Sequence, residues 1–318
     1  LMQLFTQTLF YKVEDQFKSN NGKLDKIKED GFDLEKEMQT LCENNMNQLF
    51  NLKFVASEFS VDNFRIDTLA YDKETKSFVI IEYKNTKSYS VIDQGYSYLS
   101  NMLNNKAEYI LQYITNTNKT ILKGDIDWSQ SRVFFVSPKY TKYQLESINF
   151  KDLPIYLYNL KKYKGNLIDL ELITPNNTSE SINTVSSSEI KEQVNKEVKV
   201  YTEDEHLQKT NEKMLEIYNE IKDEILDFGD NIEIKATKLY IAFTVNNHNF
   251  CDIIPQKTQL KIFINLRKGE LNDPNELMRD ISNIGAWGNG DYEIVIKNKD
   301  NIYDILSLIK QSYDIKVQ

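Results

Sequence analysis

An acidic residue and a lysine, Glu82 and Lys84, stand one residue apart at the end of the apolar run SFVIIEYKN, residues 77–85. Residues two apart on a strand project from the same face, so the carboxylate and the ammonium group would lie side by side. Asp67 lies in the preceding strand candidate, FRIDTLAYD, and the polar sequence DKET after it is typical of a turn. Three charges would then meet where the interior of a sheet ends.

Such a cluster is costly unless a cation or a substrate compensates it. Asp67 and Glu82, with the backbone carbonyl of Tyr83, would suit Mg²⁺, a hard ion that takes oxygen ligands and keeps several waters. Lys84 would lie beside a metal-bound water, where it could hold or help activate that water toward phosphorus. The alternative is structural, an Asp and a Lys-Glu pair at strand ends, because acidic-x-Lys triplets such as Glu74-Thr75-Lys76 recur in the chain.

The helix expected after this strand carries two further polar side chains. Gln94 and Tyr98 are four residues apart, so they share one helix face and can both point at the sheet end. The amide and the phenol could orient a water or bind a substrate phosphate. The alternative is that they form an ordinary half-buried helix face.

These residues need a sheet with helices against it. A β-hairpin is expected within residues 3–29, followed by a helix over 34–50 with Asp33 as its N-cap. The elements that follow are strands at 52–61, 64–72 and 77–85, a helix at 90–114, a strand at 131–138, a helix at 141–150 and a strand at 153–160. This order predicts an α/β domain over residues 1–173, with a mixed central sheet flanked by helices.

A polar segment separates this unit from a second one. TPNNTSESINTVSSS, residues 174–188, has little to bury, and we interpret 174–200 as a linker. A separate α+β domain follows at 201–318, with a helix at 204–228 and a meander of KLYIAFTV, FCDIIP and LKIFINL. Two more helices and the strand DYEIVIK complete it. GAWGNG, 285–290, has the reverse of the dinucleotide-binding order and is interpreted as a turn.

The composition disfavours several classes of protein. The two histidines, His206 and His248, have no partner nearby in sequence, which argues against Ser-His-Asp and histidine-metal chemistry. Cys42 and Cys251 lie far apart without metal-ligand neighbours, so neither a disulfide framework nor a zinc site is supported. No stretch approaches the roughly 18 to 20 apolar residues of a membrane span, and no signal-peptide pattern is present. We therefore expect a cytoplasmic protein without membrane contact.

The charge is unevenly distributed. Of the formal net charge of -9, residues 1–175 contribute 22 Lys and Arg against 23 Asp and Glu, or -1, and residues 176–318 contribute 17 against 25, or -8. The near-neutral first part leaves nucleic-acid binding open. The acidic second part could serve as a protein-interaction surface.

Together the candidate residues resemble a known family. Asp67, then Glu82-x-Lys84 after an apolar strand, then Gln94-x-x-x-Tyr98 on the next helix is similar to the PD-(D/E)xK nuclease superfamily. The Gln-x-x-x-Tyr element is similar to its RecB-like branch, and the run FRIDTLAYD, FVIIEYKN and VIDQGYSYL resembles the core of mismatch- and flap-cleaving endonucleases. The resemblance covers about residues 33–140 and implies a restriction-endonuclease-like core.

This resemblance implies metal-dependent hydrolysis of a nucleic-acid phosphodiester with Mg²⁺ or Mn²⁺. By the motif match, Asp67 and Glu82 would hold the metal ion and Lys84 would position the attacking water. Gln94 would support the site. The expected biological setting is DNA repair, restriction or phage defence.

Further residues follow from the same resemblance. In the family a helix with an early glutamate precedes the core, as Glu37 does here, and Glu58 in the first core strand is a second accessory carboxylate. Lys87, Lys139 and Lys142 would contact phosphates, with tyrosines beside the last two to stack on bases; the alternative is a solvated surface. The expected partner is nucleic acid, with DNA favoured over RNA. Many nucleases of this fold pair to cut two strands, which allows a homodimer.

The whole chain also resembles uncharacterised two-domain bacterial and archaeal proteins, some of them labelled predicted transport protein. Two other functions therefore stay open. One is a non-catalytic nucleic-acid- or protein-binding module on a nuclease fold, with the acidic C-terminal domain as the interaction surface. The other is a soluble transport-associated protein, which the absence of a membrane span leaves without physical support.

Overall fold

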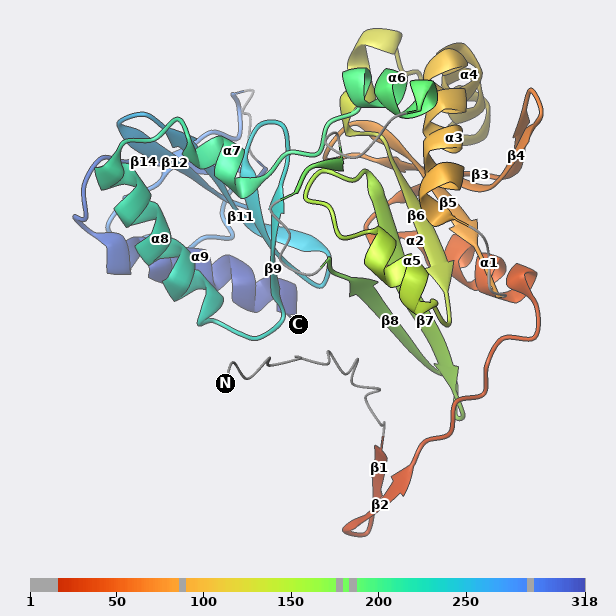
Figure 1. The fold of residues 1–318 in the computed structure, drawn as a ribbon. Helices are drawn as coiled ribbons and strands as arrows, with labels where there is room; N and C mark the ends of the chain where they lie inside the picture. The colour runs from red at the N-terminus through yellow and green to blue at the C-terminus, as the bar shows by residue number, and fades with distance from the viewer. Residues whose placement is uncertain (1–16, 86–89, 176–179, 183–187, 285–288, 318) are drawn as a thin grey trace, which may run out of the picture.

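The computed structural model describes residues 17–85, 90–175, 180–182, 188–284 and 289–317 (Figure 1). In these residues the strands form two six-stranded sheets and one two-stranded hairpin. We call them the first sheet, with strand order β3-β4-β5-β6-β7-β8, the second sheet, with order β13-β14-β12-β11-β10-β9, and the terminal hairpin, β1-β2.

The first sheet is mixed. Its strands are β3 (Lys53–Val61), β4 (Phe64–Asp72), β5 (Ser77–Tyr83), β6 (Arg132–Ser137), β7 (Ile155–Tyr163) and β8 (Leu167–Ile173). β5, β6 and β7 run parallel, and the remaining neighbours pair antiparallel. The carboxyl ends of the three parallel strands therefore lie side by side at one end of the sheet, where the Glu82 motif lies.

Helices cover both faces of the first sheet (Figure 1). They are α1 (Glu35–Asn44), α2 (Met46–Phe50), α3 (Val91–Asn104), α4 (Lys106–Thr117), α5 (Lys142–Ser147) and α6 (Glu189–Glu197). On one face Met38 of α1 packs in a core with Val79 and Ile81 of β5. On the other face Leu99 of α3 packs in a core with Ile80. β5 is apolar on both faces because it is buried along its whole length, as its uninterrupted apolar run predicts.

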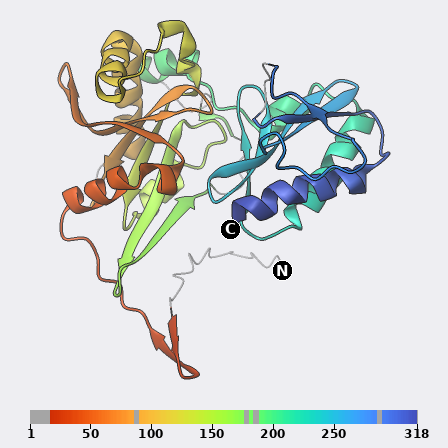
Figure 2. The same cartoon turned by 180° about the vertical axis from the view of Figure 1, so that it is seen from behind.

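The second sheet is antiparallel throughout. Its strands are β9 (Ile232–Ala236), β10 (Ile241–Val245), β11 (His248–Gln256), β12 (Gln259–Ile264), β13 (Arg279–Asp280) and β14 (Tyr292–Ile296). Its helices are α7 (Glu203–Leu207), α8 (Glu212–Leu226) and α9 (Ile302–Val317). Figure 2 shows α8 and α9 together against this sheet, and Tyr218 of α8 and Ile309 of α9 belong to its core. The predicted meander of β10, β11 and β12 is confirmed.

Two helices predicted as continuous are each divided in two. The prediction of one helix over 34–50 is wrong because α1 ends before Asn45, and that over 90–114 is wrong because α3 ends before Asn105. Each asparagine turns its side-chain amide back to a carbonyl one turn earlier, at 2.8 Å and 3.0 Å. This bond offers the backbone an alternative to the regular helix ladder, and the chain leaves helical geometry at that point.

Other boundaries also differ from the predictions. Asp33 is not the N-cap of α1; that position is Leu34, which makes no side-chain capping bond. The helix predicted over 204–228 is divided into α7 and α8, because Asn211 caps a new helix by accepting from a backbone N–H. Between β12 and β14 the described residues form β13 and no helix, and β8 and β9 were not predicted.

Within the described ranges no helix is long and apolar enough to cross a membrane.

The segment interpreted as a linker, 174–200, is partly packed against the first sheet. Its described residues include α6, whose Val194 is fully buried with Val198 in the core beside α3. Ile182 is buried in the same core, and its backbone N–H donates to Asp152 at 2.7 Å. The polar composition hid these apolar anchors, although Val194 and Val198 are four residues apart, as on one face of a helix.

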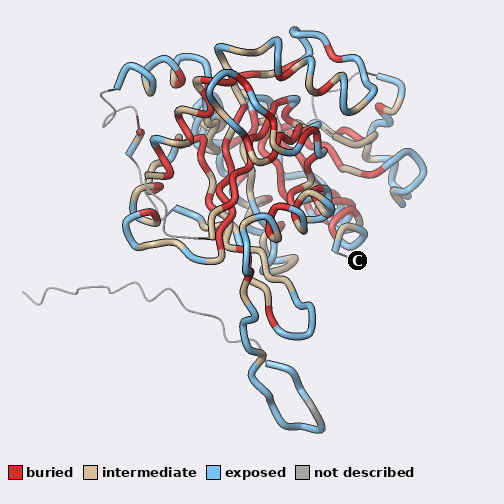
Figure 3. Tube along the Cα trace, turned by 90° about the vertical axis from the view of Figure 1, so that its right-hand side faces the viewer, coloured by how far each residue is buried: buried red, intermediate tan, exposed pale blue. Residues whose placement is uncertain are grey.

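The terminal hairpin is shorter than the predicted hairpin of residues 3–29, of which 1–16 lie outside the described residues. β1 (Phe17–Asn20) pairs with β2 (Lys23–Lys26), and both strands are exposed where their side chains are described. Figure 3 shows the hairpin extending from the body of the protein in the exposed colour. The backbone N–H groups of Asp30 and Gly31, just after it, donate to Lys162 at the end of β7, which fastens its base to the first sheet.

Candidate active site

The two carboxylates predicted from the sequence lie on neighbouring strands. β4 and β5 pair as far as Thr68 opposite Ile81, and Asp67 and Glu82 are the next residues of the two strands. The backbone N–H of Tyr83 donates to Asp67 Oδ2 at 3.0 Å. The acidic side chains therefore share one end of the first sheet.

Glu82 is 4% exposed and accepts three hydrogen bonds. Lys84 Nζ donates to its Oε1 at 2.7 Å, and Gln94 Nε2 donates to the same oxygen at 3.0 Å. The Tyr98 hydroxyl donates to Oε2 at 2.8 Å and also lies 3.2 Å from Gln94 Nε2. The strand end and the helix face identified in the sequence thus meet at one carboxylate.

Asp67 is less well compensated than Glu82. Only its Oδ2 accepts a hydrogen bond, so Oδ1 has no donor among the described residues. Burial and, next, the charge of Glu82 raise the pKa of Asp67 to about 6, although Tyr83 N–H and Lys84 act in the opposite direction. A raised carboxyl pKa indicates a position that lacks positive charge.

Lys84 and Tyr98 keep their protons at physiological pH. Burial alone would lower the pKa of Lys84, but the hydrogen bond and charge of Glu82 outweigh burial and raise it. Burial and then the charge of Glu82 raise the pKa of Tyr98. Both groups therefore act as donors. Lys84 is suited to hold a water or a phosphate oxygen, and poorly suited to take a proton from it.

The local structure of α3 determines how close Gln94 and Tyr98 lie to the first sheet. The helix begins where the Ser90 side chain accepts from the backbone N–H of Asp93. One turn on, a Cβ at Gly95 would lie only 2.5 Å from the side chain of Ile155 on β7. The absence of a side chain at Gly95 lets α3 approach the sheet closely, and this approach brings the two donors to Glu82.

α1 presents a glutamate other than Glu37 to this end of the sheet. Glu37 pairs with Lys162 at 2.5 Å and does not contact the carboxylate pair. Glu35 instead accepts from the backbone N–H of Asn85 at 2.8 Å, directly after the Glu82-x-Lys84 motif. Two residues along a helix differ by about 200° in direction, so Glu35 and Glu37 cannot serve the same place.

Glu58 lies near the carboxylate pair of Asp67 and Glu82, but it is already bonded to two cationic side chains. It is bonded to Lys36 at 3.1 Å and to Arg65 at 2.6 Å. Its backbone has a φ of 53°, a conformation that a glutamate rarely adopts. After burial and Glu82, its charge is a further cause of the raised pKa of Asp67. Glu58 therefore influences Asp67 electrostatically without touching it.

The structure describes two of the three lysines that were predicted to contact phosphates. Lys87 lies outside the described residues, and Lys139 and Lys142 are exposed between β6 and α5 and at the start of α5. The Tyr140 hydroxyl donates to two backbone carbonyls, at 2.7 Å and 3.2 Å, so this ring is a structural element. Tyr143 is 75% exposed and is free to stack on a base.

A comparison with curated proteins shows where this chain belongs. It is 45% identical over 297 residues to an uncharacterized protein from Haemophilus influenzae strain Rd, and the match spans 93% of this chain and 98% of the relative. The chain belongs to the same family as this protein. In the chain described here, residues 203–316 match a family model described as a domain of unknown function, DUF5655.

Two solved structures show weak similarity. The complex of EndoMS with double-stranded DNA is 18% identical, with a TM-score of 0.24, and a repair endonuclease from Pyrococcus abyssi is 20% identical, with a TM-score of 0.21. Each match covers 36% of this chain and 42% of the other. At these scores the likeness does not define a shared fold.

Sequence reasoning missed a polar network behind Asp67. Gln39 on α1 donates to the Asp67 backbone carbonyl at 2.8 Å and to Glu43 at 3.0 Å. Thr68 also donates to Glu43, at 2.6 Å. Gln39 and Glu43 are four residues apart on one face of α1, and this spacing was the available signal.

Proposed function

We propose that this protein is a metal-dependent nuclease with a restriction-endonuclease-like core. The observation that supports this most directly is the position of Asp67 and Glu82 on the adjacent strands β4 and β5, where Tyr83 N–H donates to Asp67 at 3.0 Å and Lys84 Nζ lies 2.7 Å from Glu82. An acidic pair made of the buried Glu82 and the partly buried Asp67, next to a lysine that stays protonated, suits hydrolysis of a phosphodiester. A purely structural ion pair would have no use for the second carboxylate.

The donor set fits Mg²⁺ or Mn²⁺. Among the described residues Asp67 Oδ1 has no donor, and the raised pKa of Asp67, due first to burial and then to Glu82, supports a site that would gain from added positive charge. The described residues contain no cluster of three His, Cys, Asp or Glu able to hold a metal ion. Asp67 and Glu82, with the Tyr83 carbonyl, would therefore hold an ion that keeps most of its waters, as Mg²⁺ does. Such an ion supplies a water of lowered pKa and stabilises charge on phosphate oxygens.

The side chains of the site have distinct tasks in this proposal. Lys84 remains an ammonium group and orients the attacking water or a phosphate oxygen by hydrogen bonding. Gln94 and Tyr98 hold Glu82 in place, because each donates to one of its two oxygens. Their removal is expected to loosen Glu82 rather than to remove a reacting group.

Exposed lysines at the same end of the first sheet favour nucleic acid, and DNA first, as the substrate. The terminal hairpin and the residue pair after it, 17–28, contain four lysines and one acid, Asp25, in a chain of net charge -9. Its base is fastened to the carboxyl end of β7, which is parallel to β5. With Lys139 and Lys142 it offers phosphate contacts around the site. Pairing of two copies to cut two strands, and a location in the cytoplasm, are further parts of this proposal.

One observation favours a second candidate function, a non-catalytic binding module. Glu82 already has three donors from Lys84, Gln94 and Tyr98, so this half of the site is satisfied without a metal ion. In that case the acidic part of the chain that contains the second sheet and its helices, which we call the second sheet region, would serve as a protein-interaction surface. The part that contains the first sheet and its helices is the first sheet region. The two functions differ in whether divalent metal supports any cleavage.

The test is cleavage of double-stranded DNA, single-stranded DNA and RNA by the purified full chain with Mg²⁺, Mn²⁺ or Ca²⁺. Lys84→Ala is expected to abolish metal-supported cleavage, while Lys257→Ala, a charge change in the distant β11–β12 turn, is expected to leave it unchanged. Cleavage that is equal in wild type and Lys84→Ala would refute the nuclease. Absence of cleavage together with tight DNA binding would favour the binding module.

A further inference from the structure

The turn between β4 and β5 enters the second sheet region. Glu74 in this turn accepts from Tyr240 OH at 2.9 Å, from Asn249 Nδ2 at 2.6 Å and from Lys235 Nζ at 2.9 Å. Asn249 also donates to the fully buried Asp252 at 3.0 Å. The hairpin that carries Asp67 and Glu82 is therefore held at its opposite end, about 17 Å away along the strands, by the region matched as DUF5655.

Two adjoining cavities open at this junction. One has a volume of about 520 Å³ and the other about 380 Å³. Both are lined by Asn51 from the first sheet region, by Glu74, and by Arg267 and Asn289 from the second. Because they share these walls, they form one junction cavity contributed by both sheet regions.

The acidic groups of the junction cavity already have partners. Asp72 is paired with Arg132 at 2.5 Å, and Glu74 has its three donors. The remaining lining carboxylate, Glu270, accepts from the backbone N–H of Arg267 at 2.7 Å and is exposed to solvent. Little negative charge is therefore left without a donor.

The cationic groups of the same cavity, in contrast to the acidic groups, lack partners among the described residues. The side chains of Lys73, Arg267 and Lys316 all line it, and none has an ion-pair or hydrogen-bond partner among the described residues. Arg267 lines both parts of the cavity. Unpaired cations in a concave wall whose acids are neutralised make an anion site.

An unsatisfied amide supports the same conclusion. Both polar side-chain atoms of Asn265 are buried and lack a hydrogen-bond partner, although Asn265 lines the cavity. A buried polar group without a partner is costly and marks a place where a ligand or water is expected. His248 in the same wall has a pKa lowered by burial and by Lys316, so it offers a neutral ring to a ligand.

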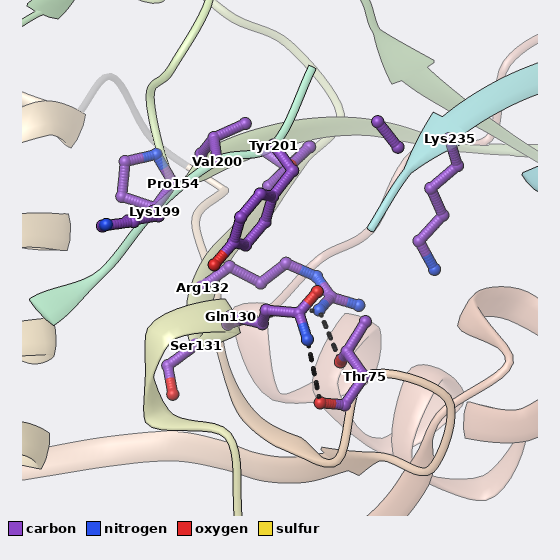
Figure 4. A pocket seen from close by; sticks show the side chains of 11 residues that line it. Thr75, Gln130, Ser131, Arg132, Pro154, Lys199, Val200, Tyr201 and Lys235 are labelled. Atoms are coloured by element: carbon purple, nitrogen blue, oxygen red, sulfur yellow. Dashed lines mark hydrogen bonds between the residues drawn. The ribbon is translucent and has the colours of Figure 1, made fainter. Parts of the chain in front are cut away.

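A neighbouring pocket, drawn in Figure 4, lacks these properties. It is lined by Arg132, Lys235 and Tyr201 and has a volume of only about 60 Å³. Arg132 is paired with Asp72, and Lys235 with Glu74 at 2.9 Å. Arg132 and Lys235 are therefore already neutralised, and the pocket is too small for more than a water or two.

We propose that the junction cavity binds a phosphate-bearing small molecule, with Arg267 as the main phosphate ligand. Arg267 offers a planar fork of donors that matches phosphate geometry, and Lys73 and Lys316 add charge. The Asn289 amide nitrogen already donates to Tyr240 at 2.9 Å and to Asp252 at 3.0 Å, so its Oδ1 is the atom left to accept from the rest of the molecule. This site is separate from the carboxylate pair, and it stands whether or not the protein is a nuclease.

The test is isothermal titration calorimetry of the full chain at constant ionic strength, with inorganic phosphate, adenosine monophosphate, adenosine and a short single-stranded oligonucleotide as probes. Inorganic phosphate and the mononucleotide are expected to bind saturably. Because a charge-assisted contact contributes on the order of 1.5–3 kcal/mol, Arg267→Ala is expected to weaken this binding by about tenfold or more. Lys257→Ala serves as the matched charge control and is expected to bind as wild type.

Four results would overturn the proposal, and the first three concern the small probes. They are the absence of saturable binding by both phosphate and the mononucleotide, equal weakening in Arg267→Ala and Lys257→Ala, and adenosine binding as tightly as its monophosphate. Arg267-dependent binding of the oligonucleotide alone would assign the cavity to a nucleic-acid backbone and would also contradict a small molecule. Thermal melting of Arg267→Ala is expected to match wild type, because its guanidinium has no partner to lose.

Discussion

Replacing Asp67 by asparagine removes one charge from the carboxylate pair while keeping the shape of the side chain. The amide oxygen can still accept from the backbone N–H of Tyr83, as Asp67 Oδ2 does at 3.0 Å. The substitution therefore tests the electrostatic argument with little change in packing. We expect Asp67→Asn to be more stable than wild type at neutral pH in the absence of divalent metal.

The magnitude follows from the pKa of Asp67, which burial and then the charge of Glu82 raise from 3.8 to about 6. The difference of about 2 units corresponds to about 3 kcal/mol. Because Asp67 is only partly buried, solvent screening reduces this to about 1–2 kcal/mol. For a chain of this size the melting temperature of the variant would rise by roughly 2 to 8 °C.

The sign of the pH dependence is fixed by the direction of the shift. The folded state binds the Asp67 proton more tightly than the unfolded chain, so wild type loses this stability as the pH rises from about 4 to about 6. Asp67→Asn has no such proton to lose. Its advantage should be absent near pH 4 and complete above pH 6.

The assay is thermal and urea unfolding of both proteins from pH 4 to pH 8, with and without Mg²⁺. Mg²⁺ should stabilise wild type above pH 6 and leave Asp67→Asn unchanged, because the ion binds the native carboxylate pair. Asp25→Asn on the exposed terminal hairpin is the control and should show neither effect. A variant less stable than wild type at pH 7.5, by the same amount as at pH 4, would refute the reasoning.

Three other variants test elements outside the carboxylate pair. Glu74→Gln should destabilise the protein by about 1–3 kcal/mol in urea unfolding, because donors from the second sheet region lose a charged partner; an unchanged transition would contradict this. Gly95→Ala should cost about 1–3 kcal/mol and reduce cleavage, because its Cβ would lie 2.5 Å from Ile155; wild-type stability would contradict the close approach of α3. Lys18→Glu with Lys23→Glu should weaken duplex binding and flatten its salt dependence in fluorescence anisotropy, whereas an unchanged salt slope would exclude the hairpin from the interface.

The centre of the site was predictable because it depends on short-range patterns. Seven consecutive buried residues of β5 leave a strong apolar run, and the turn before it fixes the antiparallel pairing with β4. The four-residue spacing of Gln94 and Tyr98 fixes a shared helix face. Those local rules were enough to bring Asp67, Glu82 and both donors together.

The accessory residue on α1 was not predictable in the same way. Choosing between Glu35 and Glu37 requires the rotation of α1 about its own axis, which depends on how Met38 and Cys42 pack beneath the sheet. The pairing of Glu37 with Lys162, 125 residues away, settles that rotation. Sequence spacing alone gives no information on a partner so distant.

The junction between the two sheet regions was likewise beyond local reasoning. Glu74 belongs to one of several acidic-x-Lys triplets, yet its partners Tyr240 and Asn249 lie 166 and 175 residues further along the chain. The helix breaks at Asn45 and Asn105 also escaped prediction, because an asparagine within an otherwise regular pattern is usually tolerated.

The central claim is that Asp67 and Glu82 form a divalent metal site. The most direct measurement is anomalous diffraction from crystals of the full chain soaked in Mn²⁺. The account predicts an anomalous peak between the two carboxylates in wild type and no peak in Asp67→Asn. A wild-type crystal without a peak there, with Glu82 still bonded to Lys84, Gln94 and Tyr98, would contradict it.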